Sequence, residues 1–295
     1  MLADVLPFLR CPVCRLELTG LDTAVRCPRG HSFDRAKQGY VHLTANPVAH
    51  PGDSARMVDA RTDFLAAGHY DFIAAALAAA APAIAGLVVD VGAGIGYHLA
   101  AVLDAHPDAV GLAVDVSKPA LRRAARAHPR IGAVLADAWL GLPVADGAAT
   151  VLLNVFAPRN GPEFARVLAP DGLLLVVTPT GDHMGELVEA LGLLTVDPAK
   201  EERVAATLSP WFTEGASQTY EKSLLLTRDE VAGLVGMGPS AWHLDPGELS
   251  ARIAPLPEPV AVTARVRLSS YSQVPPETLI GGSSQGRLGG APDGG

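Results

Sequence analysis

Residues 87–97 read LVVDVGAGIGY, and this stretch decides the fold. Apolar residues around one acid, Asp90, run into a Gly-x-Gly-x-Gly turn, which is typical of a buried parallel strand whose end approaches a ligand closely. Gly92, Gly94 and Gly96 carry no Cβ atom that would hold the ligand away. A helix starting directly after the turn would add its N-terminal amides, so the stretch predicts a cofactor site.

The spacing of the glycines distinguishes two cofactor classes. The dinucleotide fingerprint is G-x-G-x-x-G, whereas here the third glycine comes one residue early. Asp90 lies two residues before the first glycine, where a carboxylate repels a pyrophosphate and suits the amino group and sulfonium of S-adenosylmethionine. Asp115 ends a second apolar segment about 20 residues further on, where an acid accepts hydrogen bonds from the ribose hydroxyls. We therefore expect S-adenosylmethionine; a tight turn without a ligand is the alternative.

Strands and helices alternate after this point, which predicts an α/β, Rossmann-like domain with a doubly wound parallel sheet. Two later strands are expected to close the sheet as an antiparallel hairpin, which gives a mostly parallel sheet of seven strands. The expected strands are 87–91, 110–114, 133–136, 150–156, 173–178, 217–226 and 261–268. The expected helices of the domain are 97–105, 119–127, 163–168, 184–194 and 228–234.

All three cysteines lie within the first 30 residues, in the pattern Cys11-x2-Cys14-x12-Cys27-x3-His31. Two tight turns would each present a pair of metal ligands, with a short hairpin between them. The spacing predicts a Cys3His zinc ribbon, and so short a segment needs the metal to fold because it cannot bury a core of its own. Unmetallated structural thiols are the alternative.

The N-terminal segment is more basic than the rest of the chain. The net charge of −8 argues against nonspecific coating of nucleic acid. Arg29, Arg35 and Lys37 nevertheless lie near aromatic residues beside the metal, which suits single-stranded RNA because its phosphates need cations and its bases stack. A solvated charged face is the alternative interpretation.

Length and composition bound the organisation of the chain. With 295 residues it can form one α/β domain and a smaller one. We expect a zinc-ribbon RNA-recognition domain at 1–44, a linker with helices at 45–84, the S-adenosylmethionine-dependent domain at 85–278 and a disordered tail at 279–295. No apolar run reaches the roughly 18 residues needed to span a bilayer, and no signal peptide is evident, so we expect a cytoplasmic protein with no membrane partner.

Taken together, the chain resembles the zinc-ribbon 23S ribosomal RNA guanine-N1 methyltransferases, and within them the branch associated with resistance to tylosin and related macrolides. The run PGDSARMVDARTDFLAAGHY, residues 51–70, is the most specific match, since neither zinc ribbons nor methyltransferases in general carry it. The other matching stretches are CPVC, CPRGHSFDRAKQGYVHL, VVDVGAGIGYH, AVDVSKPALRRAAR, NVFAPRN and PTGDHM.

The resemblance implies zinc on the four ribbon ligands and cofactor contacts from Tyr70, from the Gly94-Ile95 turn and from His183. It also implies a homodimer with a groove for a 23S ribosomal RNA hairpin. The glycine loop departs from the family pattern, because Ala93 and Ile95 stand where other members often have Cys and Glu. This departure removes a polar contact to the cofactor and leaves the backbone contacts.

Methylation of guanine N1 is an in-line displacement for which the base must be unpaired or flipped out. Asn154 and Phe156 end the expected strand beside the target base, where Asn154 can hydrogen-bond the guanine edge and Phe156 can stack on it; a buried strand end is the alternative. Asp137, which we also place at the cofactor, Asp182 and His183 are candidates by location for the group that removes the proton. The rival functions are a methyltransferase of small molecules and a catalytically idle RNA-binding protein.

Overall fold

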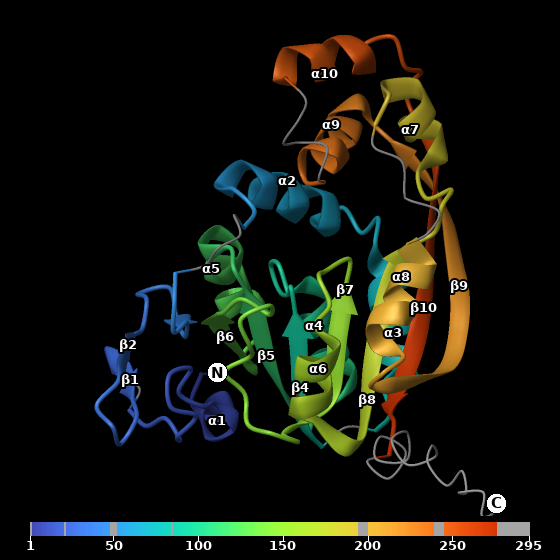
Figure 1. The fold of residues 1–295 in the computed structure, drawn as a ribbon. Coiled ribbons are helices and arrows are strands. Elements are labelled where there is room, and N and C mark those ends of the chain that lie inside the picture. The colour runs from blue at the N-terminus through green and yellow to red at the C-terminus, as the bar shows by residue number, and fades with distance from the viewer. Residues whose placement is uncertain are drawn as a thin grey trace, which may run out of the picture.

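The structure is a computed structural model, and it describes residues 2–20, 22–47, 52–83, 85–193, 200–238 and 245–275. The tail expected at 279–295 lies outside the described residues. Figure 1 shows one large sheet with helices on both faces, a small two-stranded unit at its N-terminal side and a group of helices above one end of the strands.

The large sheet has eight strands in the order β3-β6-β5-β4-β7-β8-β10-β9. The strands from β3 to β8 run parallel, and β10 lies antiparallel between β8 and β9. The predicted mostly parallel α/β sheet with a terminal hairpin is therefore confirmed. The strands are β3 (Val41–His42), β4 (Gly86–Val91), β5 (Ala109–Asp115), β6 (Ile131–Leu135), β7 (Ala149–Val155), β8 (Leu168–Pro179), β9 (Phe212–Leu226) and β10 (Val260–Gln273).

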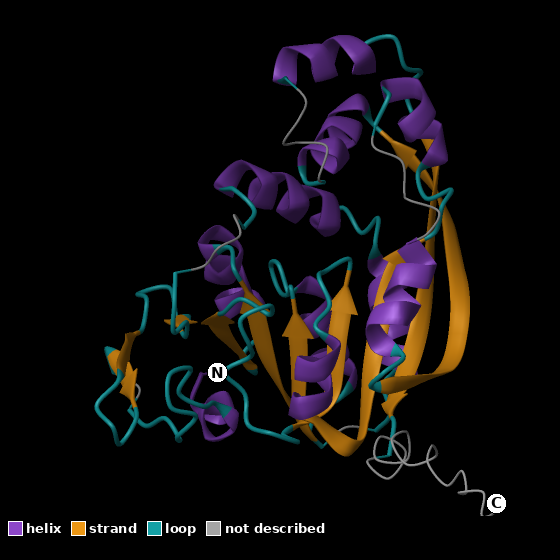
Figure 2. Ribbon diagram, in the orientation of Figure 1, coloured by secondary structure: helices purple, strands orange, loops and turns teal. Residues whose placement is uncertain are grey.

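Both faces of the central strands are buried, as a nearly continuous apolar strand requires. In β4, Val88 packs into the core on one face, whereas Val89 and Val91 pack into the core on the other. Three helices cover the first face, and α1, α6 and α8 lie with the second core (Figure 2). The helices of the first face are α3 (Asp71–Ala80), α4 (Tyr97–Ala105) and α5 (Lys118–Ala127), and those of the second are α1 (Leu2–Val5), α6 (Gly161–Val167) and α8 (Lys200–Leu208).

Four helices sit beyond the carboxyl ends of the parallel strands (Figure 1). They are α2 (Ala55–Ala66), α7 (Gly185–Leu191), α9 (Arg228–Gly236) and α10 (Pro246–Ile253). Ser54 caps α2, and Thr227 and Glu230 form a capping box at α9, so each of these two helices begins at a residue that accepts from its first free amides. The sequence did not predict α10 or α8. These helices enclose the end of the sheet at which α/β proteins bind ligands.

The N-terminal segment is less separate than the sequence predicts. It contains η1 (Leu6–Phe8) and the two-stranded unit β1 (Ala24–Arg26) and β2 (Ser32–Asp34), but β3 belongs to the large sheet, where Val41 pairs with Val134. The expected count of seven strands was therefore one short, because a two-residue strand gives no periodic signal. A Cβ on Gly132 would lie 2.2 Å from Val5, so the packing of α1 on β6 requires this glycine. The ribbon thus covers an edge that would otherwise expose unpaired backbone groups.

Candidate active site and metal centre

A cavity of about 600 Å³ lies at the carboxyl ends of β4 and β7, beneath α2, α7 and α9. Its volume is in the range of pockets that bind small ligands. The structure brings seven of the sequence-predicted residues into its wall. They are Tyr70, Asp90, Gly92, Gly94, Ile95, Phe156 and His183.

All three glycines of the turn have a positive φ angle, but each lies against a different part of the structure. A Cβ on Gly92 would lie 2.4 Å from the Cβ of Ala157, and one on Gly96 would lie 3.2 Å from the Cα of Ala124. These two glycines therefore allow the turn to pack against the end of β7 and against α5. A Cβ on Gly94 would instead face the cavity, 3.4 Å from Nη1 of Arg61. Close approach to a ligand thus rests mainly on Gly94, and Gly96 does not line the cavity.

Asp90 is a buried carboxyl group with 2% exposure, and its Oδ1 atom has no hydrogen-bond partner among the described residues. Burial, together with the charge of nearby Asp115, raises the pKa of Asp90 to about 8. A buried polar atom without a partner is costly, and a positively charged group bound beside a buried carboxylate stabilises its charged form. The position therefore fits the amino group or sulfonium of S-adenosylmethionine.

Asp115 holds the glycine turn, and it does not itself line the cavity. Its Oδ2 accepts from the backbone N–H of Gly94 and its Oδ1 from that of Ser117, both at 2.8 Å. Burial raises the pKa of Asp115 despite these two bonds. Each carboxylate oxygen has a second acceptor position, so ribose hydroxyls can still bind. The sequence had predicted the ribose role alone and missed the support of the turn.

Asp137 follows β6 and is buried, with Oδ1 accepting from the N–H of Trp139 at 2.9 Å and Oδ2 without a partner among the described residues. It does not line the cavity. Its free oxygen leaves it able to accept one more hydrogen bond at the edge of the turn, which fits a contact to the cofactor better than proton transfer at the base.

Arg61 of α2 is a cavity residue that the sequence analysis did not single out. Its Nη1 lies 2.6 Å from Oδ2 of Asp53, and its Nη2 donates to the carbonyl of Met237 at 2.9 Å. A guanidinium has five N–H donors, so further donors remain for a ligand. Burial and the charge of Arg61 lower the pKa of His98 to about 4, which keeps this second cavity residue neutral near pH 7. Arg61 is therefore a fixed positive charge above the glycine turn.

Three aromatic side chains cluster in the wall of the cavity. The rings of Tyr70, Phe156 and His183 have centroids 6.1 to 6.3 Å apart, and the Tyr70 hydroxyl lies 3.2 Å from Nε2 of His183. Burial raises the pKa of Tyr70, so its hydroxyl stays protonated. Phe156 is 41% exposed and has a φ angle of 53°, a strained conformation for a bulky residue. An exposed ring in a strained backbone beside a cavity is a functional candidate.

Two sequence-predicted residues are placed differently from expectation. Asn154 is fully buried and does not line the cavity; its Nδ2 donates to the carbonyl of Pro158 at 2.9 Å, which holds the end of β7. Its Oδ1 has no partner among the described residues, so a contact to guanine stays a prediction. Asp182 accepts from Thr180 and pairs with Arg265, so it is a poor proton acceptor. Of the three candidates for the base, His183 is the one in the cavity wall.

The four predicted metal ligands converge at the N-terminal side of the molecule. The ligand atoms of Cys11, Cys14, Cys27 and His31 all lie within 4.8 Å of one another, with the Cys14 and Cys27 sulfurs 3.6 Å apart and Nδ1 of His31 at 3.2 Å from the Cys27 sulfur. Tetrahedral zinc with bonds of about 2.0 to 2.3 Å places its ligand atoms roughly 3.5 to 3.8 Å apart. The set therefore fits a structural zinc ion.

The protein environment favours the thiolate at Cys27 but not at Cys11, where burial raises the pKa. Burial opposes ionisation of Cys27, but hydrogen bonds from the His31 backbone and from the Cys14 side chain outweigh it and lower the pKa of Cys27 to about 6. Metal ligands bind as thiolates, so this lowering assists the metal.

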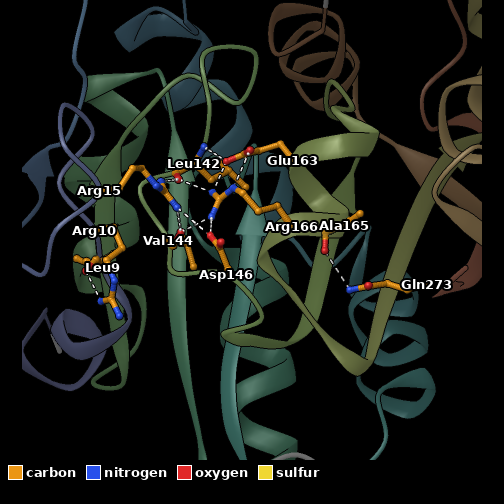
Figure 3. Close-up of polar contacts among 10 residues, drawn as sticks. All are labelled: Leu9, Arg10, Arg15, Leu142, Val144, Asp146, Glu163, Ala165, Arg166 and Gln273. Atoms are coloured by element: carbon orange, nitrogen blue, oxygen red, sulfur yellow. Dashed lines mark hydrogen bonds and ion pairs between the residues drawn. The ribbon is translucent and has the colours of Figure 1, made fainter. Parts of the chain in front are cut away.

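A cluster of charges fastens the first zinc turn to the large domain (Figure 3). Arg15, directly after Cys14, donates to the carbonyls of Leu142 at 2.9 Å and Val144 at 2.7 Å and lies 3.3 Å from Asp146. Arg166 donates to the same two carbonyls at 2.9 and 2.8 Å and pairs with Glu163. The metal site is therefore coupled to the loop between β6 and β7.

Comparison with known proteins gives matches for the zinc-binding segment and for the chain as a whole. The family model described as RlmA, N-terminal, a zinc ribbon, matches residues 9–50. The chain is 59% identical over 292 residues to a provisionally named 23S rRNA (guanine-N(1)-)-methyltransferase of Micromonospora griseorubida, a match that covers 92% of this chain and 99% of the relative. It is 48% identical to the 23S rRNA (guanine(748)-N(1))-methyltransferase of Streptomyces fradiae over 93% of this chain and 100% of that protein. The chain belongs to the 23S rRNA guanine-N1 methyltransferase family.

A more distant member, YxjB of Bacillus subtilis, is also provisionally named as such a methyltransferase and is 29% identical over 79% of this chain and 86% of its own length. A solved S-adenosylmethionine-dependent methyltransferase of Thiobacillus denitrificans, in complex with S-adenosyl-L-homocysteine, matches 72% of this chain and 98% of its own with a TM-score of 0.49 and 16% identity.

The basic residues predicted to contact RNA lie on the surface of this methyltransferase. Arg29 is in the second zinc turn, Arg35 follows β2, and Lys37 is in the turn that leads to β3; all three are exposed. They lie outside the cofactor cavity. Among the described residues no helix is long and apolar enough to cross a membrane.

Proposed function

We propose that this chain transfers the methyl group of S-adenosylmethionine to N1 of a guanine in 23S ribosomal RNA. The observation that carries the proposal is one cavity with two chemically different walls. Asp90, Gly94 and Arg61 form a charged wall next to the glycine turn, and Tyr70, Phe156 and His183 form an aromatic wall of the same cavity. The first wall suits the cofactor and the second suits a flat base.

The methionine end of the cofactor carries both a positive amino group and a negative carboxylate. Asp90, with its unpartnered Oδ1, would hold the amino group, and Arg61 would hold the carboxylate with the donors left free by Asp53 and Met237. Asp115 would accept from the ribose, and Asp137 would accept from the adenine side with its free oxygen. When bound, the cofactor supplies the electrophilic methyl group; the protein orients it toward the aromatic wall.

Guanine N1 lies on the pairing edge, so the base must leave its helix to react. Phe156 would stack on the extruded base, since a base offers a π-face to an aromatic ring. His183 is the candidate acceptor for the N1 proton by location, because it lines the cavity. Its Nε2 is hydrogen-bonded to the Tyr70 hydroxyl and its Nδ1 to the backbone of Arg265, so Nε2 can accept the N1 proton only when the bond to Tyr70 is displaced.

The family relatives support a finer proposal. The Streptomyces fradiae relative is named for guanine 748, and with 48% identity over nearly all of both chains we propose the same nucleotide here. Methylation at that site would give resistance to tylosin and related macrolides. We further propose that the protein acts in the cytoplasm as a homodimer and that the ribbon residues Arg29, Arg35 and Lys37 contact the phosphates of the RNA hairpin.

The test is to incubate the purified zinc-loaded protein with S-adenosylmethionine and unmethylated 23S ribosomal RNA. The expected product is 1-methylguanosine, seen by mass spectrometry of nucleosides and as a primer-extension stop at guanine 748. Methylation of other nucleotides alone would reject the position, and methylation of a panel of small metabolites without RNA would favour the rival small-molecule function. Failure to bind the cofactor would leave an idle RNA-binding protein.

A further inference from the structure

The exposed face of α5 carries an unusual set of charges for an acidic protein. The helix reads KPALRRAARA and holds four cations and no acid. Ala120, Leu121 and Ala124 are buried against the sheet, whereas Lys118, Arg122 and Arg126 are exposed. These three have no ion pair or hydrogen-bond partner among the residues that the structure describes. We refer to Lys118, Arg122 and Arg126 as the α5 row.

Helical geometry aligns the α5 row. The three residues are spaced by four, so they follow one another along one side of the helix, about 6 Å apart in rise. Cations four residues apart repel one another, and Lys118 lies at the helix end that disfavours positive charge. The neighbouring Arg123 is different, because it pairs with Asp59 of α2. Arg126 in the last turn is favoured by the helix dipole, but the repulsion within the row and the position of Lys118 oppose the stability of the helix, so helix stability does not explain the row as a whole.

The α5 row continues the basic surface of the ribbon. A Cβ on Gly39, in the turn after Lys37, would lie 3.6 Å from the Cβ of Ala125, and Tyr40 packs into the same core as Leu121. Arg122 and Arg126 flank Ala125 on the helix, so they lie next to the turn that carries Lys37. Figure 1 shows α5 and the ribbon at the same edge of the sheet, next to β6.

The α5 row also reaches the rim of the cofactor site. Ser117 caps the helix two residues after Asp115, so Lys118 stands at the carboxyl edge of the sheet, and the rest of the row runs away from it along the outside of the domain. A second cavity of about 710 Å³ lies between the end of β3 and the start of α5, with His42 and Thr44 on one wall and Lys118 on the other.

The acids that face this surface do not neutralise it. Asp59 pairs with Arg123 and Asp53 pairs with Arg61, so these two acids are already matched; Asp63, the other acid of α2, is exposed. Asp34 of β2 is the exposed acid on the ribbon beside Arg35. The exposed charges along α5 are therefore positive. A polyanion is the kind of partner that neutralises such a row of positive charges.

We propose that the α5 row is a phosphate-binding track that docks the RNA strand running from the ribbon to the active site. The inference rests on the proposed function and extends it, because it assigns the surface that links ribbon docking to the presentation of the guanine. Phosphate contacts fix the position of a nucleic acid without reading its sequence, and arginine and lysine supply them.

The test compares wild type with Arg126→Gln and with the double variant Arg122→Gln/Arg126→Gln, using the full chain with zinc and a 23S ribosomal RNA transcript. Arg252→Gln is the control for loss of an exposed arginine from the last turn of a helix; because Arg252 donates to the carbonyl of Leu191 at 2.8 Å, the melting temperature of each variant is measured beside its affinity. The expected loss of RNA affinity is about tenfold for the double variant, and the slope of log affinity against log salt should fall by about 1.5 when two phosphate contacts are lost. Affinity for S-adenosylhomocysteine should not change.

Each outcome decides a separate question. An unchanged salt slope in the double variant, or an equal loss in Arg252→Gln, would overturn the phosphate track. A loss of heparin binding without any loss of RNA binding or methylation would show a nonspecific polyanion surface and would also overturn it. If the wild type itself forms no 1-methylguanosine, the proposed function fails instead of the track.

Discussion

Arg15 and Val144 are joined by a hydrogen bond of 2.7 Å between a guanidinium Nη2 and a backbone carbonyl, across 129 positions of sequence. Arg15 also has a φ angle of 62°, which the first zinc turn imposes directly after Cys14. The metal thus sets the backbone that aims this side chain at the large domain. Zinc removal should therefore lower the stability of the large domain as well as that of the ribbon.

We expect chelation of zinc to unfold the two metal-binding turns and to lower the stability of the large domain without unfolding it, because the sheet retains a core of its own. Arg15→Ala should lower the free energy of unfolding of the zinc-loaded protein by about 1.5 to 3 kcal/mol, the range for hydrogen bonds that involve a charge. Thermal unfolding of both proteins, with zinc and after chelation, measures the coupling.

The stability lost on chelation is compared between the wild type and the Arg15→Ala variant. If Arg15 transmits the metal's stabilisation, chelation should cost the Arg15→Ala variant less than it costs the wild type. Equal losses in the two proteins would show that the metal and the domain are coupled by another route, such as the pairing of β3 with β6. Arg10→Gln is a control, since Arg10 contacts carbonyls of its own segment, Pro7 and Leu9.

Binding of the cofactor should release a proton at Asp90. Its pKa of about 8 means that the carboxyl is mostly neutral at pH 6 to 7, and it must ionise to hold the cofactor's amino group. The affinity should therefore rise about tenfold per pH unit in this range, with one proton released per site. Calorimetry in buffers with different ionisation enthalpies measures the proton directly, and Asp90→Asn should show neither the proton nor the slope.

The raised pKa of Asp90 also makes the stability of the cofactor-free protein depend on pH. The carboxyl ionises near pH 4 in the unfolded chain but near pH 8 in the folded one, so the free energy of unfolding should fall as pH rises from about 4 to about 8. Asp90→Asn should remove this decline. A variant with the same pH profile as the wild type would assign the titration to another group.

The sequence predicts most of the sheet because apolar runs, glycine turns and alternation are local signals. It does not reveal that Val41 joins the large sheet, because a two-residue strand has no period to detect. The helices α8 and α10 were missed for a related reason: α8 is short and polar, and α10 begins at Asp245 and Pro246 within a segment rich in loop residues. Their placement depends on tertiary packing rather than on local pattern.

For the site, the sequence predicts residue types but not their neighbours. The sequence predicts that Asp115 binds the ribose, but only the structure shows its hydrogen bonds to Gly94 and Ser117. Arg61 is one arginine of an unremarkable helix until α2 is placed over the glycine turn. Asn154 shows the opposite case, since a polar residue at a strand end proves to be fully buried and bonded to Pro158.

Phe156 should matter for RNA methylation but not for cofactor binding or stability. Phe156→Ala should slow methylation of 23S ribosomal RNA by about 5- to 100-fold, the loss that corresponds to one stacked base, while Phe156→Tyr should retain most of the rate. Because the backbone at Phe156 is strained, Phe156→Gly should not lower the melting temperature. Equal rates for the Ala and Tyr variants would exclude stacking by this ring.

Arg61 should recognise the carboxylate of the cofactor, and the choice of ligand can isolate this contact. Arg61→Gln also loses its pairing with Asp53 and its bond to Met237, so a general fall in affinity would not be informative. The comparison is therefore between S-adenosylhomocysteine and its analogue that lacks only the carboxylate. Arg56→Gln, in the first turn of the same helix, controls for the loss of a positive charge from α2.

In the wild type, removal of the carboxylate from the ligand should weaken binding by about 10- to 100-fold, since a charge-assisted hydrogen bond is worth roughly 1.5 to 3 kcal/mol. In Arg61→Gln the two ligands should bind about equally, because the group that distinguishes them is gone, whereas Arg56→Gln should discriminate as the wild type does. 5′-Methylthioadenosine, which lacks the whole amino-acid portion, should bind Arg61→Gln and wild type alike. A variant that still prefers the carboxylate ligand by the wild-type factor would move this role to another donor in the cavity.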